Sequence, residues 1–349
     1  MNDKSLDVLK KYDLDVNQVG RGRGGMLIET KAGMKLLLEC EKPDKYYERE
    51  DMITQAVAEG GFGKIDTYVR NSEGGLVTEA EDGRRYVIKN WFMGRECNIK
   101  SIDEICRAVE ILGRLHNNMN NLNFLEFHKE GMVSVAEVKE TDLTSECTRE
   151  TAVKSENMKN VSKRHMKELK LASNYLKNKR NKSEFEQIAY KNIGAFYEEA
   201  AVAVKRMEAD DIIKRFLQAA KNGEMSHGNY SYHNVIFSDK DIAVTNFDHC
   251  KNECQISDLY EFMRKIMEKY DWDMELAYKM IDEYDKVKPL SDMDLELLSV
   301  MFAFPEKFWK VINFYFNSSK SWIPRKSIEK LKTVVAQNEK RKRFLETIS

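Results

Sequence analysis

Proline is scarce in this chain, and glycine is confined to part of it. Four prolines occur in 349 residues, all outside residues 44–288, and none of the 17 glycines follows Gly228. Because these two residues break or punctuate regular elements, their scarcity predicts long helices in the C-terminal part. Twelve of the glycines lie in the first 94 residues. That concentration predicts a turn-rich N-terminal part with strands.

Other absences narrow the class of protein. No apolar run reaches about 18 residues, so we expect no membrane span, and the first residues lack the apolar core of a secretion signal. The 57 Lys and Arg residues nearly balance the 58 Asp and Glu residues, so no overall field favours nucleic acid as a partner. Six cysteines without tight pairing predict reduced thiols and cytoplasmic synthesis.

The N-terminal part shows alternating strand and helix signals. Apolar runs at Met26–Thr30 and Met34–Cys40 flank a short turn and predict a β-hairpin. A helix is expected over 45–59, a second pair of strands at 76–80 and 85–91, and an amphipathic helix over 101–120. This order is typical of the N-lobe of a kinase and its exit into a helical lobe.

Residues 139–192 are highly charged. Their basic runs raise the possibility of a nucleic-acid surface. Interleaved acidic residues and an apolar stripe favour a solvated helical hairpin instead. The stripe comprises Leu169, Leu176, Phe185, Ile188 and Phe196.

The octapeptide His227–Asn234 carries the strongest chemical signal. A loop of this spacing followed by two short apolar strands and an acidic tip is how a kinase presents its base and metal ligands. The strands are 235–237 and 242–244, and the tip reads Thr245-Asn246-Phe247-Asp248. In a kinase loop the third residue is an aspartate, whereas here it is Asn229.

On these residues the chain resembles the aminoglycoside-phosphotransferase and choline-kinase group, and within it the CotS-type spore-coat proteins of endospore-forming bacteria. Further matching segments are 94–96, 115–116, 258–265, 305–310 and 320–324. The resemblance implies an α+β, bilobal protein-kinase-like fold. It comprises a small β-rich N-lobe (1–92) and a larger helical C-lobe (93–349) with the charged insertion near 139–192.

The resemblance also implies roles for single residues. Asn229 occupies the base position, Asn234 a magnesium-ligand position, and Asn246 the position of the main metal-binding aspartate. Asp248 is the adjacent acidic residue, and Asp258 matches an aspartate that braces the loop.

The nucleotide-binding positions of the N-lobe also depart from the family pattern. Glu39 falls where a phosphate-binding lysine is expected, and Gly22 and Gly24 lie where a loop would cover the phosphates. Without a lysine-serine ending this glycine run is no P-loop, and a flexible turn is the simpler interpretation. His227 is expected to brace its loop by hydrogen bonding.

These departures predict a weak or inactive kinase. An amide oxygen is not basic at neutral pH, and general-base catalysis contributes about 10²–10⁴-fold. The hypothesis is a pseudokinase-like component of the spore coat that has a structural or assembly role and whose partners are other coat proteins. No cofactor or metal is assigned to it. The cluster of aromatic residues at 302–316 is expected to be mostly core, with some residues in an exposed patch suited to assembly.

The alternative is an active ATP-dependent small-molecule phosphotransferase that uses Asp248 and Asn234 as magnesium ligands. On a strand, residues 246 and 248 would point to the same face, so Asp248 could replace the missing aspartate. Lys35 shares a face with Glu39 by the same alternation and could supply a displaced cation.

Overall fold

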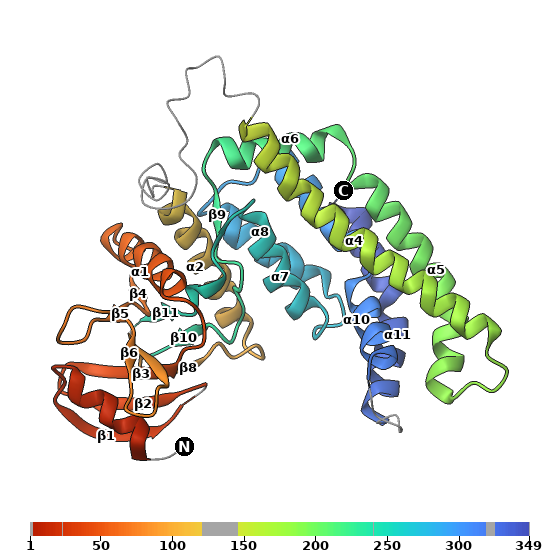
Figure 1. The fold of residues 1–349 in the computed structure, drawn as a ribbon. Coiled ribbons are helices and arrows are strands. Elements are labelled where there is room, and N and C mark those ends of the chain that lie inside the picture. Colours follow the sequence, from red (N-terminus) through yellow and green to blue (C-terminus); the bar gives the residue numbers. More distant parts are fainter. Residues whose placement is uncertain (1–2, 23, 121–145, 240, 319–324, 349) are drawn as a thin grey trace. The chain divides into compact units, whose positions relative to one another are not determined.

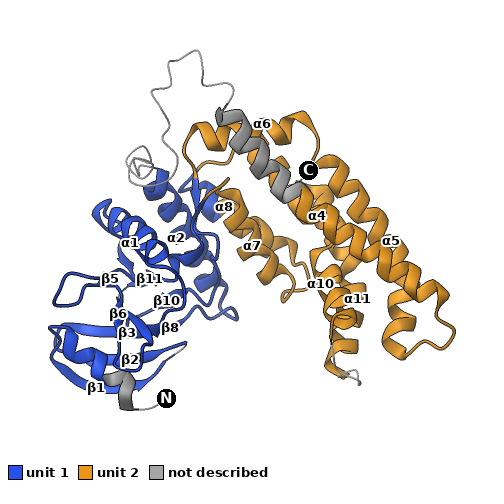
Figure 2. Cartoon of the chain, viewed as in Figure 1, with its two compact units in different colours: residues 1–127, 225–251, 283–288 blue, residues 128–224, 252–282, 289–349 orange. Residues whose placement is uncertain are grey.

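The computed structural model describes residues 3–22, 24–120, 146–239, 241–318 and 325–348. The chain divides into two compact units (Figure 2): residues 1–127, 225–251 and 283–288, and residues 128–224, 252–282 and 289–349. The loop 227–234 thus belongs to the same unit as the N-terminal strands, whereas the sequence places it in the helical lobe. The lobe boundary at residues 92 and 93 itself stays a prediction.

The N-terminal strands of the first unit form an antiparallel sheet (Figure 1), with strand order β1-β2-β3-β7-β5 and β6 paired to β7. The predicted hairpin is confirmed as β2 and β3, and the second predicted pair as β6 and β7. The strands are β1 (Val16–Arg21), β2 (Met26–Thr30), β3 (Gly33–Glu39), β5 (Tyr68–Val69), β6 (Thr78–Glu79) and β7 (Arg85–Asn90).

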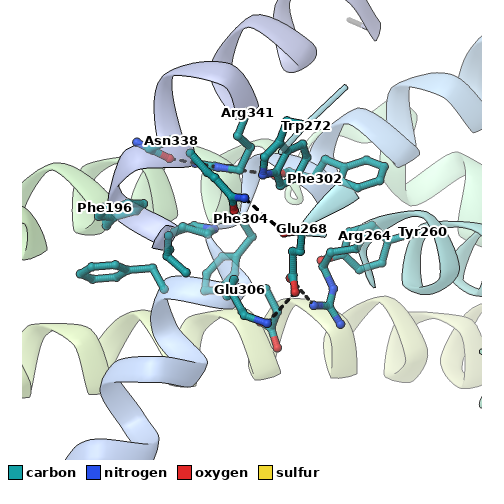
Figure 3. A pocket seen from close by; sticks show the side chains of 15 residues that line it. Phe196, Tyr260, Arg264, Glu268, Trp272, Phe302, Phe304, Glu306, Asn338 and Arg341 are labelled. Carbon is teal, nitrogen blue, oxygen red and sulfur yellow. Dashed lines mark hydrogen bonds and ion pairs between the residues drawn. The ribbon is translucent and has the colours of Figure 1, made fainter. Parts of the chain in front are cut away.

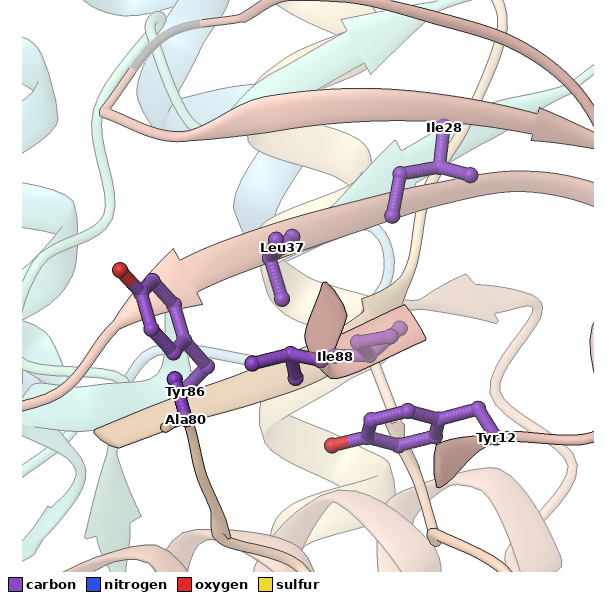
Figure 4. Packing of buried hydrophobic residues seen from close by; sticks show 7 residues of the cluster. Tyr12, Ile28, Leu37, Ala80, Tyr86 and Ile88 are labelled. Carbon is purple, nitrogen blue, oxygen red and sulfur yellow. The ribbon is translucent and has the colours of Figure 1, made fainter. Parts of the chain in front are cut away.

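Each face of this sheet is covered by a helix. One face packs with η1 (Asp3–Lys11) through a cluster that includes Tyr12, Leu37, Tyr86 and Ile88 (Figure 4). Because side chains alternate along a strand, Val87 points to the opposite face. There it packs with aromatic residues of α1 and β5.

Two helices of this unit match the sequence prediction closely. Helix α1 (Asp44–Glu59) begins after Pro43 and ends at Gly60, where Gly61 takes a positive φ of 82°. Proline suits a helix start because its missing N–H has no helical partner there. Helix α2 (Ile102–Asn120) buries the expected apolar face, although Ile102 itself is exposed.

A second sheet carries the loop of interest. Its order is β4-β11-β10-β8, with β10 antiparallel to both β11 and β8. The strands are β4 (Lys64–Ile65), β8 (Arg95–Glu96), β10 (Val235–Phe237) and β11 (Ile242–Val244). Strand β9 (Met225–Ser226) precedes the loop and pairs with β12 (Lys251–Asn252), and η2 (Phe247–His249) follows β11. The pairing of β10 with β8 and of β11 with β4 explains why residues 225–251 join the first unit.

The second unit is helical. The charged segment forms a helical hairpin, as predicted, with α5 started by a capping box between Ser183 and Glu186; residues 139–145 lie outside the described part. Of the predicted stripe, Leu169, Leu176 and Phe185 are fully buried. The helices are α4 (Glu146–Asn178), α5 (Glu184–Arg206), α6 (Asp210–Lys221), α7 (Ile256–Met267), α8 (Met274–Asp285, whose end joins the first unit), α9 (Asp292–Ala303), α10 (Glu306–Phe316) and α11 (Arg325–Ile348).

None of the described helices combines the length and apolar character that a membrane crossing requires.

Candidate functional site

His227 fixes the start of the loop between β9 and β10. Its ring is fully buried, with Nδ1 accepting a hydrogen bond from the Asn229 backbone N–H at 3.2 Å. Nε2 then carries the proton and donates to the Thr245 carbonyl oxygen at 3.2 Å. His227 therefore joins the loop to the tip that follows β11 by hydrogen bonds at both ring nitrogens.

Gly228 is required where the loop meets the tip. Its φ is 73°, and a Cβ at this position would lie 2.2 Å from the carbonyl oxygen of His249. Any side chain here would collide with backbone, which cannot give way cheaply. The His-Gly pair thus has a packing function whether or not the loop catalyses a reaction.

The amide side chains that follow are bonded within the site. Asn246 Nδ2 donates to Asn234 Oδ1 at 2.7 Å, and Asn234 Nδ2 donates to the Asn229 carbonyl oxygen at 2.8 Å. The structure therefore brings together Asn229, Asn234 and Asn246, as predicted from the sequence. At the two metal positions the contact is a hydrogen bond between neutral amides.

Asp248 does not lie on a strand, and the predicted alternation of residues 246 and 248 is wrong. Asn246 takes the left-handed conformation (φ 66°, ψ 62°) and begins η2, which contains Asp248. The Asp248 carboxylate lies 3.4 Å from His249 Nε2, while its backbone oxygen accepts a hydrogen bond from Tyr46 on α1 at 2.6 Å. Asp248 Oδ1 is buried without a hydrogen-bond partner in the described chain.

A buried ion cluster lies beside the tip. Lys89 on β7 pairs with Glu50 of α1 and with Asp66 Oδ2, the latter at 3.2 Å. Tyr68 donates its hydroxyl proton to Glu50 at 2.5 Å, and the Asn246 N–H donates to Asp66 Oδ2 at 3.0 Å. The side chains of Lys89 and Glu50 are 4% exposed and that of Asp66 is 0% exposed. The ammonium group next to the kinase-type loop is thus enclosed by two carboxylates.

The cluster contains one cation and two buried carboxylates, and this imbalance determines which of these groups are protonated. Burial raises the pKa of Asp66 to about 6, against the opposing influence of Lys89. Burial alone lowers the pKa of Lys89, but Asp66 and Glu50 outweigh it and hold that pKa above its usual value. Lys89 therefore stays charged, and Asp66 is the group that takes up a proton on mild acidification.

Glu39 and Lys35 lie on the other face of the sheet from Lys89. In the β3–β7 register Leu36 is opposite Lys89, whereas Lys35 is opposite Asn90 and Glu39 is opposite Tyr86. Directly opposite residues share a face, so neither Lys35 nor Glu39 points toward α1. Glu39 lies 3.8 Å from Arg84, and Lys35 Nζ donates to Asn90 Oδ1 at 2.7 Å. Lys89 is the lysine that pairs with Asp66 beside the tip, and it was not singled out from the sequence.

The glycine run forms the turn between β1 and β2. The Gly22 N–H donates to the Gly25 carbonyl oxygen at 3.0 Å, and Gly24 has a φ of 76°. A Cβ on Gly25 would lie 2.2 Å from the Leu37 carbonyl oxygen. The described glycines thus lie between two paired strands, and Gly25 packs directly against β3.

A cleft of about 820 Å³ opens in the first unit where residues 91–95 meet the β10–β11 ribbon. Its charges are largely paired within the protein, since Lys64 bonds to Asp241 at 2.8 Å and Arg95 makes two bonds to Glu104 at 2.8 and 2.7 Å. The loop and tip amides are not among its lining residues. The cleft is large enough for a small ligand but is separate from the amide pair.

The second unit contains a smaller cavity of about 30 Å³ between aromatic and charged side chains (Figure 3). Glu268 accepts from Arg264 and Lys307 at 2.7 Å each, and Arg341 Nη1 donates to the Phe302 carbonyl oxygen at 2.8 Å. A volume of this size holds about one water, so it is no substrate site.

Two further predicted features concern metal and bracing. No group of three or more His, Cys, Asp and Glu side chains in the described ranges is arranged to hold a metal ion. Asp258 is buried in the first turn of α7 in the second unit, and its role as a brace stays a prediction.

Similar solved structures identify the fold. An aminoglycoside phosphotransferase from Alicyclobacillus acidocaldarius is 16% identical, with a TM-score of 0.81 over 98% of this chain and 94% of that one. A spectinomycin phosphotransferase in complex with ADP and spectinomycin gives 10% identity and 0.58 over 96% of each chain. A microcompartment-associated aminopropanol kinase gives 13% and 0.53 over 98% and 97%. The fold is thus the predicted kinase-like aminoglycoside-phosphotransferase fold.

A comparison with protein-family models identifies the chain more narrowly than its fold does. The family model described as "Spore coat putative kinase YutH" matches residues 6–348, and the chain belongs to this family. A comparison with curated protein sequences gives no significant match.

Proposed function

We propose that this chain is a catalytically weak or inactive kinase-fold protein that serves as a structural or assembly component of the spore coat. The observation that carries the proposal is the way in which the polar groups of the kinase-type site bond one another. The amides of Asn234 and Asn246 form a pair, and Lys89 is enclosed by Glu50 and Asp66.

The residues present do not fit a magnesium nucleotide. Magnesium in phosphoryl-transfer sites is held through one or two carboxylates and the phosphates, whereas positions 234 and 246 offer neutral amides. A phosphate needs a free cation, whereas Lys89 already neutralises part of the charge of two buried carboxylates. Asn229 can orient a hydroxyl group but cannot accept its proton at neutral pH. Positions 229 and 246 therefore lack the charge that this mechanism needs, and the charge of Lys89 is already paired with carboxylates.

Isothermal titration calorimetry with ATP and magnesium tests the nucleotide part of the proposal. We expect weak or undetectable binding by the unmodified protein. A micromolar dissociation constant, or robust ATP turnover, would favour the active phosphotransferase instead.

A charge-restored variant tests the catalytic part. Asn229→Asp combined with Asn246→Asp is expected to be necessary for any detectable ATPase or kinase activity. The matched control is Asn178→Asp with Asn181→Asp, which adds the same charge at two exposed positions of the second unit. Equal activity of the restored and control proteins above background would contradict the assigned roles.

The assembly role predicts where the protein resides. It is expected to be synthesised in the cytoplasm of an endospore-forming bacterium and then to associate with other coat proteins. Asn234→Ala should reach the purified coat in the same amount as the unmodified chain, because assembly does not depend on catalysis. If the variant is folded and stable but is absent from the purified coat, the proposed structural role is overturned.

A further inference from the structure

Helices α4 and α10 pack side by side in the second unit (Figure 1). Their side chains leave a groove of about 290 Å³. Four residues of α4 and four of α10 line it, together with Asn317. The α4 residues are Glu168, Leu171, Ala172 and Tyr175, and the α10 residues are Trp309, Ile312, Asn313 and Phe316.

The floor of the groove is apolar and fixed in place. Trp309 Nε1 donates to Glu168 Oε2 at 2.7 Å, and the rings of Tyr175 and Phe316 meet edge to face at 5.5 Å. Two of the lining residues are open to solvent, since Leu171 is 67% exposed and Tyr175 is 52% exposed. Large apolar side chains this open beside a preformed groove are typical of a binding surface.

The segment of chain that contributes the α4 side of the groove carries more basic than acidic residues. Between residues 161 and 182 the only acidic residue is Glu168, which Trp309 and Arg164 already engage. Lys167 and Lys177 are exposed, and neither forms an ion pair within the described residues. The cations of this segment are Lys163, Arg164, Lys167, Lys170, Lys177, Lys179, Arg180 and Lys182. Lys163 and Lys179 are paired with Glu208 and Glu186. The unneutralised cations of α4 that remain beside the groove include Lys167 and Lys177.

We propose that this groove, the α4–α10 groove, binds an acidic amphipathic helix of a partner protein. An amphipathic helix presents apolar residues at i, i+3, i+4 and i+7, which suits a narrow apolar floor between two helices. Acidic residues on its flanks would meet the cations of α4, and this complementarity selects against basic partners. The identification of the partner as a coat protein rests on the proposed function. The existence of the groove and its charge are independent of that proposal.

Two model peptides of about five helical turns test the proposal by fluorescence anisotropy with the full chain. They share Leu at the apolar positions and differ only in carrying Glu or Lys elsewhere. The Glu peptide is expected to bind at least tenfold more tightly, and added salt should weaken it because exposed charges are screened. Equal affinity of the two peptides, or no binding of either, would overturn the proposal.

Variants assign any binding to the α4–α10 groove. Leu171→Glu should weaken the Glu peptide at least tenfold, whereas Val202→Glu on α5 should not, although Val202 is 68% exposed and the change is identical. Lys167→Glu should weaken the Glu peptide and strengthen the Lys peptide, with Lys214→Glu on α6 as its control. Unchanged binding by Leu171→Glu would refute the site.

A second copy of the chain is the competing occupant. Sedimentation velocity that shows a dimer, broken by Leu171→Glu but not by Val202→Glu, would overturn the assignment to a partner helix. None of these measurements depends on nucleotide binding, so failure of the groove and failure of the inactive-kinase proposal are separate results.

Discussion

Replacing Lys89 by methionine probes the charge balance of the kinase-type site most directly. Methionine keeps much of the apolar stem of lysine but leaves the carboxylates of Glu50 and Asp66, which are 4% and 0% exposed, without their cation. Removing one partner of a buried ion pair typically costs about 3–5 kcal/mol. The contact of Lys89 Nζ with the Tyr68 ring, 4.6 Å from its centroid, is lost as well. We therefore expect the free energy of unfolding to fall by about 3–5 kcal/mol at pH 7.

The loss should shrink on acidification. Burial raises the pKa of Asp66 to about 6 in the unmodified protein, and loss of Lys89 raises that pKa further. Below this pKa Asp66 is neutral and no longer needs a cation, so at pH 5 the variant should recover part of the lost stability. The triple variant Lys89→Met, Glu50→Gln, Asp66→Asn should recover more of it at both pH values, because a buried ion cluster can be replaced by neutral groups at little cost.

Urea unfolding followed by circular dichroism at pH 7 and pH 5 measures these differences. Lys45→Met on α1 is the control, because Lys45 is exposed and surface substitutions change stability by about 0.5 kcal/mol or less. If Lys89→Met costs less than about 1 kcal/mol at pH 7, the buried carboxylates do not depend on this cation. Lys89 would then be available for a phosphate, and the main support for an inactive site would be lost.

Two further perturbations test the neighbouring parts of the site. Asp66→Asn should flatten the pH dependence of stability. Because the pKa of Asp66 is raised, the folded unmodified protein binds an extra proton between about pH 4 and 6, and its stability relative to Asp66→Asn should fall by up to about 3 kcal/mol as the pH rises through this window. Urea titrations of both proteins across this range measure the difference in stability, and a difference that does not change with pH would contradict the prediction. Gly25→Ala should lower stability by about 1–3 kcal/mol, because its Cβ would lie 2.2 Å from the Leu37 carbonyl oxygen. Gly20→Ala is the control and should not lower stability, because the space around Gly20 is open. Thermal unfolding compares the two variants, and equal melting temperatures would show that the turn is loosely held.

Local patterns predicted the elements of the fold that depend on nearby residues. The β2–β3 hairpin and helices α1 and α2 follow from turns and apolar spacing over short stretches of chain. The bounds of α1 differ from the prediction by one residue at its start, where Pro43 and Asp44 set the first turn. The loop and tip also came together as expected, because the intervening β10–β11 ribbon is only a short hairpin.

The face on which a strand residue lies was not predictable in the same way. Alternation shows that Lys35 and Glu39 share a face, but it does not say which face meets α1. The pairing of β3 with β7 decides this, and it places Lys89 rather than Lys35 or Glu39 on the α1 side. The sequence did contain a signal for Lys89. A lysine that directly follows Val87-Ile88 in a buried strand requires a buried acidic partner.

The conformation of the tip shows a second limit. Residues 245–248 follow a strand, and their alternation predicted inward positions for Asn246 and Asp248. Asn246 instead has a φ of 66°, which ends the strand and begins η2. Asparagine enters this left-handed conformation more readily than most residues, so the amide at position 246 has a backbone role that a motif comparison does not reveal.

Several of the kinase-type residues that remain in this chain make contacts that hold the loop and the tip together. His227 links Asn229 to Thr245, Gly228 admits the His249 backbone, and Asn234 holds the Asn229 carbonyl oxygen. The positions that depart from the family pattern are those where catalysis needs a charge, namely 229 and 246, and the nearby lysine is enclosed by carboxylates. Packing contacts that are kept at positions beside missing charges are the observation that supports the proposed structural role.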